Sequence, residues 1–495
     1  MTARLLERIF GEPIDTLLAE PVESAEAEAL TSSAADGGSG PPVQNRRSAN
    51  KAARSSRPAA LGTDVDASDF GSALDWLDEH AGWSPDAAKH KVRSRLARLS
   101  AGELLDRNAR RSRVRRSEVA DALADYYGQS SADCSLYNVA CDGNDFRTSI
   151  VTRPEWVDFG CPVTPDRDLL TLDERESSTG ADLDTKRAVH RLAEAAALDV
   201  RLTNAPLYRL QDVDLTNGSI SGLVGLTPFV EYALTADLLE GELLDAISAG
   251  QSTRPSRLPL RNEYLPDLAA VLDLPGRVCA GGPLALCAIA RPADPYRGPA
   301  DFALLVQERS GSVLNAAGQL AVIPKGFHQP LKEPRAEARI GATLRREVEE
   351  ELFGRAEVDS TAGESRVASP MHRTRLSEPM RWLSDDPDRV RMECTGFGFN
   401  LVSGNYEFAS LVVIEDEEFW ARYGGAIEAN WEASGLRLYS TEDRELLNQL
   451  VADERWSNEG LFALLQGIRR LGERDDPRLD LPTVDAAFTR SANGR

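Results

Sequence analysis

The sequence is poor in aromatic residues and in histidine, and each shortage narrows the class of protein. Aromatic residues make up only 6% of the 495 residues, so a core must be built largely from leucine, valine and alanine. This composition is typical of a globular protein and unlike that of a fibrous one. Histidine occurs five times, and His80, His90, His190 and His372 show no metal-ligand spacing to one another or to a cysteine.

Paired cysteines and long apolar runs are also missing. The six cysteines contain no CxxC pair and are Cys134, Cys141, Cys161, Cys279, Cys287 and Cys394. This scatter favours buried free thiols. No apolar run approaches the roughly 18 residues needed to cross a bilayer, and the start of the chain has no signal-peptide pattern. We therefore expect a cytoplasmic protein without a membrane partner.

Positive charge is outweighed by negative charge, since the formal net charge is -22. Such a surface repels a phosphate backbone, which argues against a protein that coats nucleic acid without specificity. A local basic patch could still bind DNA.

The length predicts two or three domains with linkers, because one ordinary core does not extend over 495 residues. Composition and apolar spacing indicate a multidomain α+β protein. We predict a mostly disordered arm at 1–66, a small helical module at 67–130, a mixed α/β region at 131–260, an α/β domain at 261–475 and a C-terminal tail at 476–495.

Local patterns place the main elements. Helical spacing predicts a helix from Thr185 to Leu198, and Asn217-Gly218 predicts a turn between two strands. The apolar runs PLALCAIA, DFALLVQERSG, GQLAVIPKG, GFGFNLVS and NYEFASLVVI predict strands. Helices are expected from Gly341 to Phe353 and around 442–471.

The most informative stretch is IGATLRREVEEELFG. Glu347, Glu350 and Glu351 stand at i, i+3 and i+4, which places three carboxylates on one face of a helix. Like charges this close repel unless they are solvated or neutralised by a cation such as Mg²⁺ or Mn²⁺. The alternative to a metal site is a solvated acidic face with Val348 and Leu352 in the core.

The segment from Arg346 to Glu351 resembles the REUxEE core of the Nudix box. The resemblance implies an α/β/α sandwich from about Leu274 to Leu471, and hydrolysis of a nucleoside diphosphate linked to another group. It implies that Glu347, Glu350 and Glu351 bind the metal, with Arg346 orienting a carboxylate and a later strand adding an acid. Our candidate for that acid is Glu407, for which the alternative is an exposed strand charge.

The loop half of the box is irregular. The family pattern has a glycine, five residues, a glutamate and then seven residues before the arginine, whereas Glu337 lies one residue too far from Arg346. Gly326 is farther still, so HQPLKEPRA resembles an insertion, and the following glycine comes late, as Gly354.

Lys325 could pair with a phosphate. His328 could contact a phosphate or act as a base, although a histidine in a turn is more often a hydrogen-bonding loop residue.

A basic run precedes the predicted helix SEVADALADYY and comprises Arg107, Arg110, Arg111, Arg113, Arg115 and Arg116. The run is compatible with a small helix-turn-helix unit that contacts DNA. The second hypothesis is therefore a regulator whose Nudix-like domain senses a nucleotide or sugar metabolite. The arginines could instead form a solvated face or pair with the acidic remainder of the chain. A structural or interaction protein is the third possibility.

Overall fold

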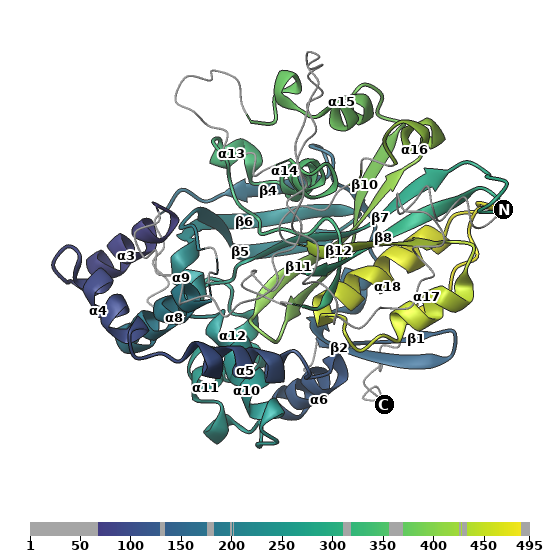
Figure 1. Cartoon of the computed structure of the whole chain (residues 1–495). Helices are drawn as coiled ribbons and strands as arrows, with labels where there is room; N and C mark the ends of the chain where they lie inside the picture. Colours follow the sequence, from purple (N-terminus) through teal and green to yellow (C-terminus); the bar gives the residue numbers. More distant parts are fainter. Residues whose placement is uncertain are drawn as a thin grey trace, which may run out of the picture. The chain divides into compact units, whose positions relative to one another are not determined.

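The computed structural model describes residues 68–128, 134–175, 183–198, 200, 202–309, 318–355, 370–424, 427 and 433–486, and Figure 1 follows the chain through them. These residues belong to one compact unit, Ala59–Arg495. The predicted arm at 1–66 and residues 487–495 of the predicted tail lie outside the described residues. No helix in the described ranges combines the length and the apolar character needed to cross a membrane.

The described chain contains both helices and strands, which makes the protein mixed α/β. The helices are α3 (Ser68–His80), α4 (Ala87–Leu96), α5 (Ala101–Arg111), α6 (Arg116–Tyr127), α7 (Pro154–Val157), α8 (Thr185–Ala197), α9 (Phe229–Ala233), α10 (Leu238–Ser248), α11 (Pro259–Tyr264), α12 (Leu268–Leu272), α13 (Pro334–Glu337), α14 (Ile340–Glu347), α15 (Glu378–Ser384), α16 (Glu417–Tyr423), α17 (Arg444–Val451) and α18 (Asn458–Gly472), with the short turns η1 (Pro255–Arg257), η2 (Val348–Leu352) and η3 (Arg373–Arg375). The strands are β1 (Ser135–Cys141), β2 (Asn144–Thr152), β3 (Cys161–Pro162), β4 (Asp168–Leu172), β5 (Pro206–Thr216), β6 (Ser219–Pro228), β7 (Gly281–Arg291), β8 (Asp301–Arg309), β9 (Leu320–Val322), β10 (Val390–Asn400), β11 (Asn405–Ile414), β12 (Ala433–Ser440) and β13 (Val484–Ala486).

The local predictions are confirmed for five strand segments, one helix and one turn. All five apolar runs contain strands, which are β7 to β11. Helix α8 begins at the predicted residue, where the Asp184 side chain accepts hydrogen bonds from the first-turn amides of Lys186 and Arg187. The Asn217-Gly218 turn joins β5 to β6, and both of its residues have positive φ angles of 54° and 66°, the geometry that favours these residue types.

A mixed sheet of ten strands is the largest element of the described chain. Its main order is β12-β8-β7-β11-β10-β2-β1-β13, with β3 beside β10 and β9 beside β8. Strands β7 and β11 pair in parallel, whereas the other pairings in this sheet are antiparallel. Strands β1 and β2, from the predicted 131–260 segment, and β13, from the predicted tail, join the same sheet as the strands of the 261–475 segment.

Helices cover both faces of this sheet (Figure 1). Strand β7 shows the division most clearly, since alternate side chains of a strand point to opposite faces. Leu284 and Leu286 belong to the apolar cluster that includes α18. Ala285 and Cys287 belong to the cluster that includes α14 and α16. The large sheet is therefore the middle layer between α18 and α14.

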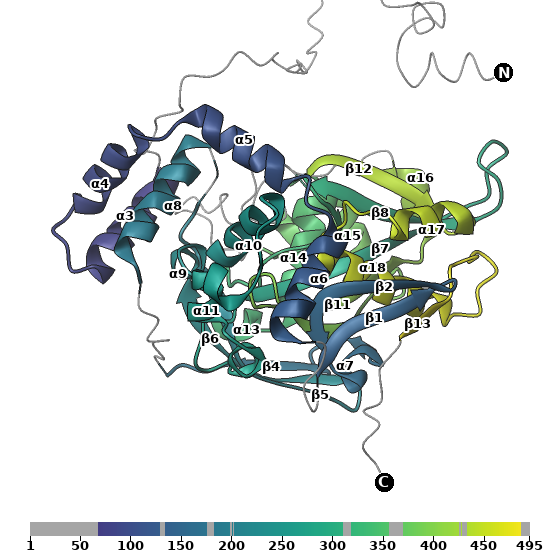
Figure 2. The same ribbon diagram turned by 90° about the horizontal axis from the view of Figure 1, so that it is seen from below.

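A smaller sheet and a helical group complete the fold. The smaller sheet has the order β4-β6-β5. Helices α3, α4, α8 and α9 share a separate apolar cluster, and Figure 2 shows α3, α4 and α8 grouped together. Both the small sheet and α13 contact the neighbourhood of α14, which connects the middle of the chain to the predicted motif.

Candidate functional site

The predicted motif lies on helix α14 and on the π-helical turn η2 that continues it. Leu344, Val348 and Leu352 recur every four residues and are buried in one cluster with strands of the large sheet. This apolar stripe fixes the rotation of the helix against the sheet. The helix is confirmed, but the sequence did not predict its π-helical end, a rare feature that often occurs at functional sites.

The glutamates of this turn are buried, so the solvated acidic face is wrong. Glu349 and Glu351 have no exposed surface, while Glu347 and Glu350 are 6% and 7% exposed. Burying a carboxylate is costly unless hydrogen bonds or positive charge compensate for lost water. The surroundings of each glutamate therefore indicate what it does.

Glu349 has partners in the chain that follows the motif. Its carboxylate pairs with Arg355 at 2.7 Å and accepts hydrogen bonds from the Ser377 amide and hydroxyl, both at 2.6 Å. Ser377 is also the N-cap of α15. Glu349 therefore connects η2 to the start of α15, a structural role that matches its absence from the predicted ligand set.

Glu347 lies against Arg346 and Gly326. A nitrogen of the Arg346 guanidinium is 2.7 Å from Glu347 Oε1 and also donates to the Phe327 carbonyl oxygen at 3.3 Å. A Cβ added at Gly326 would lie 2.1 Å from Glu347 Oε1, closer than any real contact. The structure thus brings the predicted glycine, arginine and first glutamate together, with the loop backbone directly beside the carboxylate.

Lys325 contacts two carboxylates. Its amide donates to Glu351 Oε2 at 2.6 Å, and its ammonium lies 2.7 Å from Glu459 Oε1 in the first turn of α18. Asn400 donates to the other Glu459 oxygen at 3.1 Å. Burial favours a raised pKa for Glu459, but the charge and hydrogen bond of Lys325 offset it, and the pKa is lowered. Lys325 therefore links the motif to α18.

Glu407 lies in β11 and is 5% exposed, so it is not the exposed strand charge that we considered. Burial raises its pKa to about 8; Lys325 lowers it, Glu459 raises it and Arg309 lowers it. This raised pKa favours the protonated carboxyl at neutral pH. Since metal ligands of this kind are deprotonated, Glu407 would have to ionise before it could hold a metal.

His328 is fully buried. Its ring packs against that of Tyr208 with the ring centres 4.3 Å apart and the ring planes inclined by 43°, and Nδ1 lies 3.0 Å from the Tyr406 hydroxyl oxygen. Burial, with a smaller effect of the nearby Arg346 charge, lowers the pKa of the imidazole to about 3. His328 is consequently a neutral side chain packed between two tyrosines.

The inserted loop is held by its own glutamate and by the small sheet. Glu337 Oε2 accepts hydrogen bonds from three successive amides, those of residues 331, 332 and 333, at 2.6, 3.0 and 3.2 Å. The Tyr208 hydroxyl donates to the Pro334 carbonyl oxygen at 2.5 Å, and Arg335 pairs with Glu174. Glu337, the acid nearest to the expected position in the loop half of the box, is thus used to close the loop.

The donors at this site fit a hard divalent cation in their chemistry, since Glu347, Glu350 and Glu351 offer oxygen only. Among the described residues, however, no three His, Cys, Asp or Glu side chains are already grouped so that they could hold an ion. Binding would therefore require rotation of the glutamate side chains from the positions described above.

The basic run before α6 is largely paired with acids of the same chain. Arg107 pairs with Glu194, Arg111 with Asp245, Arg115 with Glu118 and Arg116 with Glu454, at 2.7, 2.6, 3.1 and 3.3 Å. Arg116 is only 4% exposed. These contacts correspond to the alternative in which the arginines complement the acidic remainder of the chain.

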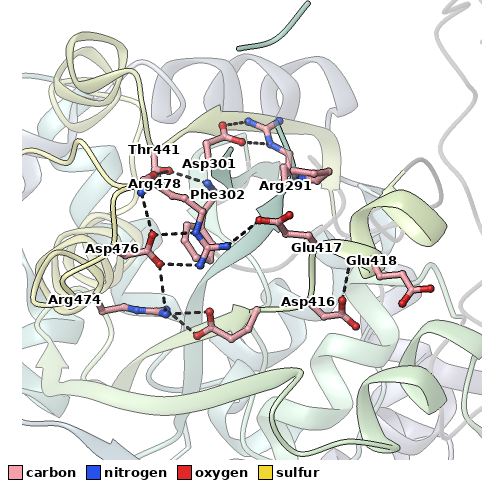
Figure 3. Close-up of polar contacts among 12 residues, drawn as sticks. Arg291, Asp301, Phe302, Asp416, Glu417, Glu418, Thr441, Arg474, Asp476 and Arg478 are labelled. Carbon is pink, nitrogen blue, oxygen red and sulfur yellow. Dashed lines mark hydrogen bonds and ion pairs between the residues drawn. The ribbon is translucent and has the colours of Figure 1, made fainter. Parts of the chain in front are cut away.

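A second charged group holds the segment that follows α18 on the large sheet (Figure 3). Arg478 pairs with Asp476 at 2.8 Å and lies over the ring of the buried Phe302 in β8, 4.3 Å from its centre. Arg474 pairs with Glu415 at 2.8 Å. Because these arginines are matched by carboxylates, the group is structural.

Comparison with known proteins gave no match, either to a protein-family model or to a curated protein. The sequence pointed to Arg346, Glu347, Glu350 and Glu351 through one short motif, and to Lys325 and His328 through the loop before it. It gave no signal for Glu459, because this residue lies 134 positions from its partner Lys325 and stands in an ordinary amphipathic helix.

Proposed function

We propose that the chain is a divalent-metal-dependent hydrolase that acts on a nucleoside diphosphate linked to another group. In this proposal the large sheet with α14 and α18 is a Nudix-like α/β/α sandwich. The main support is the burial of Glu347, Glu350 and Glu351 within one turn, beside the backbone of Lys325 and Gly326. A bound Mg²⁺ or Mn²⁺ would add positive charge to this group of buried carboxylates, beside the charge that Arg346 already supplies.

Glu347, Glu350 and Glu351 would hold the ion. The ion would shield the diphosphate and lower the pKa of a bound water. Without the ion, Arg346 pairs with Glu347 and the Lys325 amide donates to Glu351. The glutamate side chains would have to turn from these contacts to hold the ion, since no three acidic, histidine or cysteine side chains among the described residues are grouped for it. Lys325, whose ammonium pairs with Glu459, would supply a positive charge for a phosphate.

The test is hydrolysis of nucleotide sugars, dinucleotides and nucleoside triphosphates by the purified chain with Mg²⁺. We expect Glu350→Gln and Glu351→Gln to lower kcat by about 100-fold or more, because a metal contributes several kcal/mol to the barrier. Glu349→Gln is the matched control, since Glu349 lies in the same buried turn but pairs with Arg355. Equal losses in all three variants would reveal a folding effect and remove the site assignment.

The contacts of Glu337 support a second candidate, a domain that binds a nucleotide metabolite without hydrolysing it. Three backbone amides occupy one oxygen of this carboxylate, so the loop half of the box has a structural use for its acid. Calorimetry with the same compounds separates the two candidates. Binding with micromolar affinity and no turnover would favour sensing, whereas turnover that depends on Glu350 and Glu351 favours the hydrolase.

A further inference from the structure

Helix α14 begins against a strand of the small sheet. Asp168, the first residue of β4, is fully buried, and its Oδ2 accepts a hydrogen bond of 2.8 Å from the Gly341 amide. Gly341 is the second residue of α14, and a Cβ added there would lie 2.5 Å from the Val163 carbonyl oxygen. The start of the candidate catalytic helix therefore has little room to move.

This contact replaces a local cap. The residue before α14 is Arg339, and its side chain makes no capping hydrogen bond. The first amides of a helix need acceptors from outside the helix, and a carboxylate is favoured there because the N-terminus carries partial positive charge. Asp168 supplies the acceptor from 173 positions earlier in the chain.

The other groups around Asp168 come from three elements. Burial raises the pKa of Asp168 to about 6, while the amides of Gly341, Leu170 and Ile340 and the charge of Arg339 lower it. The buried thiols of Cys161 in β3 and Cys394 in β10 also lie within electrostatic range of Asp168. Among these neighbours of Asp168, Arg339 is the one that carries a positive charge.

We infer that Asp168 is a positioning residue that fixes the start of α14 and, through it, the placement of Glu347, Glu350 and Glu351. The inference rests on the proposed function for its effect on turnover. From Gly341 to Glu347 the helix rises by about 9 Å, so a shift at its start is carried to the carboxylates by a short rigid element. Displacements of about 1 Å at a catalytic group can lower a rate about 100-fold.

The experiment compares Asp168→Ala, which removes the acceptor, with Asp168→Asn, which keeps an acceptor oxygen and removes the charge. Asp78→Ala is the matched control, because Asp78 is a buried aspartate that accepts a 2.6 Å hydrogen bond from Ala88, the second residue of α4. The full-length chain is used throughout. Amide hydrogen exchange over residues 340–352 and Mg²⁺-dependent hydrolysis are measured for each variant.

For Asp168→Ala we expect exchange over residues 340–352 to accelerate about tenfold, as for the loss of a helix cap. We expect kcat to fall about 10- to 100-fold, as for loss of a group that orients a ligand, with the KM for the nucleotide within about twofold. Asp168→Asn should restore most of the wild-type exchange protection over residues 340–352 and most of the wild-type kcat. Asp78→Ala should accelerate exchange in α4 and leave residues 340–352 and kcat unchanged.

Two results would overturn the inference. One is that residues 340–352 of Asp168→Ala exchange at the wild-type rate. The other is that they exchange faster while kcat of an active enzyme stays unchanged. If Asp168→Ala does not fold, Asp168→Ser is measured in the same way, because its shorter side chain does not span the distance to the Gly341 amide. The exchange measurement does not need turnover. An inactive wild type would therefore refute the proposed function, while accelerated exchange in the variant would still support the positioning role.

Discussion

Replacing Asp168 with asparagine should change how the stability of the protein depends on pH. The folded pKa of Asp168 is raised from 3.8 to about 6, mainly by burial. Between these values the folded state binds more protons than the unfolded state, so the free energy of unfolding falls as pH rises through this window. Asparagine does not titrate, and the variant lacks this contribution.

The size of the effect follows from the shift. A change from 3.8 to about 6 is about 2 pKa units, and each unit corresponds to about 1.36 kcal/mol, so ionisation of Asp168 lowers stability by about 3 kcal/mol between the acid and alkaline limits. About 1.4 kcal/mol of this change falls between about pH 5 and about pH 7.5. Because Asp168 is fully buried, solvent screening does not reduce it.

The assay is urea unfolding of the wild type and Asp168→Asn at these two pH values, with the difference between the proteins taken at each pH. This difference cancels the pH dependence that comes from the other titratable groups, because both proteins contain them. We expect the wild type to lose about 1.4 kcal/mol more than the variant on going to the higher pH. Parallel changes in the two proteins would show that Asp168 ionises with an ordinary pKa, and the reasoning about its burial would be refuted.

Three other substitutions or measurements test the site. Gly326→Ala should lower the free energy of unfolding by about 1–3 kcal/mol in urea, because the new Cβ meets Glu347 at 2.1 Å; unchanged stability would contradict this packing. Glu349→Ala should cost about 3–5 kcal/mol in the same assay, since it leaves the Arg355 partner without its buried carboxylate, and a cost below about 1 kcal/mol would argue against that pair. The imidazole resonances of His328 should stay constant between about pH 5 and about pH 8 by NMR, because its pKa is lowered to about 3 by burial; a midpoint near 6.5 would contradict its burial.

The strands and the motif helix were predictable because their signals are local. Strands β7, β8 and β11 are buried on both faces, so they occur in the sequence as nearly continuous apolar runs bounded by glycine, proline or charge. Helix α8 was predictable for the same reason, since Asp184 and the following apolar spacing lie within one short segment.

The contacts that complete the site were not predictable, because they join distant parts of the chain. Nothing near Asp168 or Glu459 in the sequence indicates a partner 173 or 134 positions away. The same limit applies to the large sheet, in which β2 pairs with β10. Apolar patterns predict that a strand exists but not which strand lies beside it. Only the structure shows that strands from different predicted segments belong to one sheet.

The four glutamates from Glu347 to Glu351 illustrate what helical spacing does determine. In the α-helix that the sequence predicts, residues at i, i+3 and i+4 share a face, whereas the residue at i+2 lies about 200° away. Glu349 is that residue, and it bonds to Arg355 and to the start of α15, while Glu347 and Glu351 contact the Lys325–Gly326 loop. Because Glu349 is anchored in this way in the same buried turn, Glu349→Gln is the variant against which losses at Glu350 and Glu351 are judged.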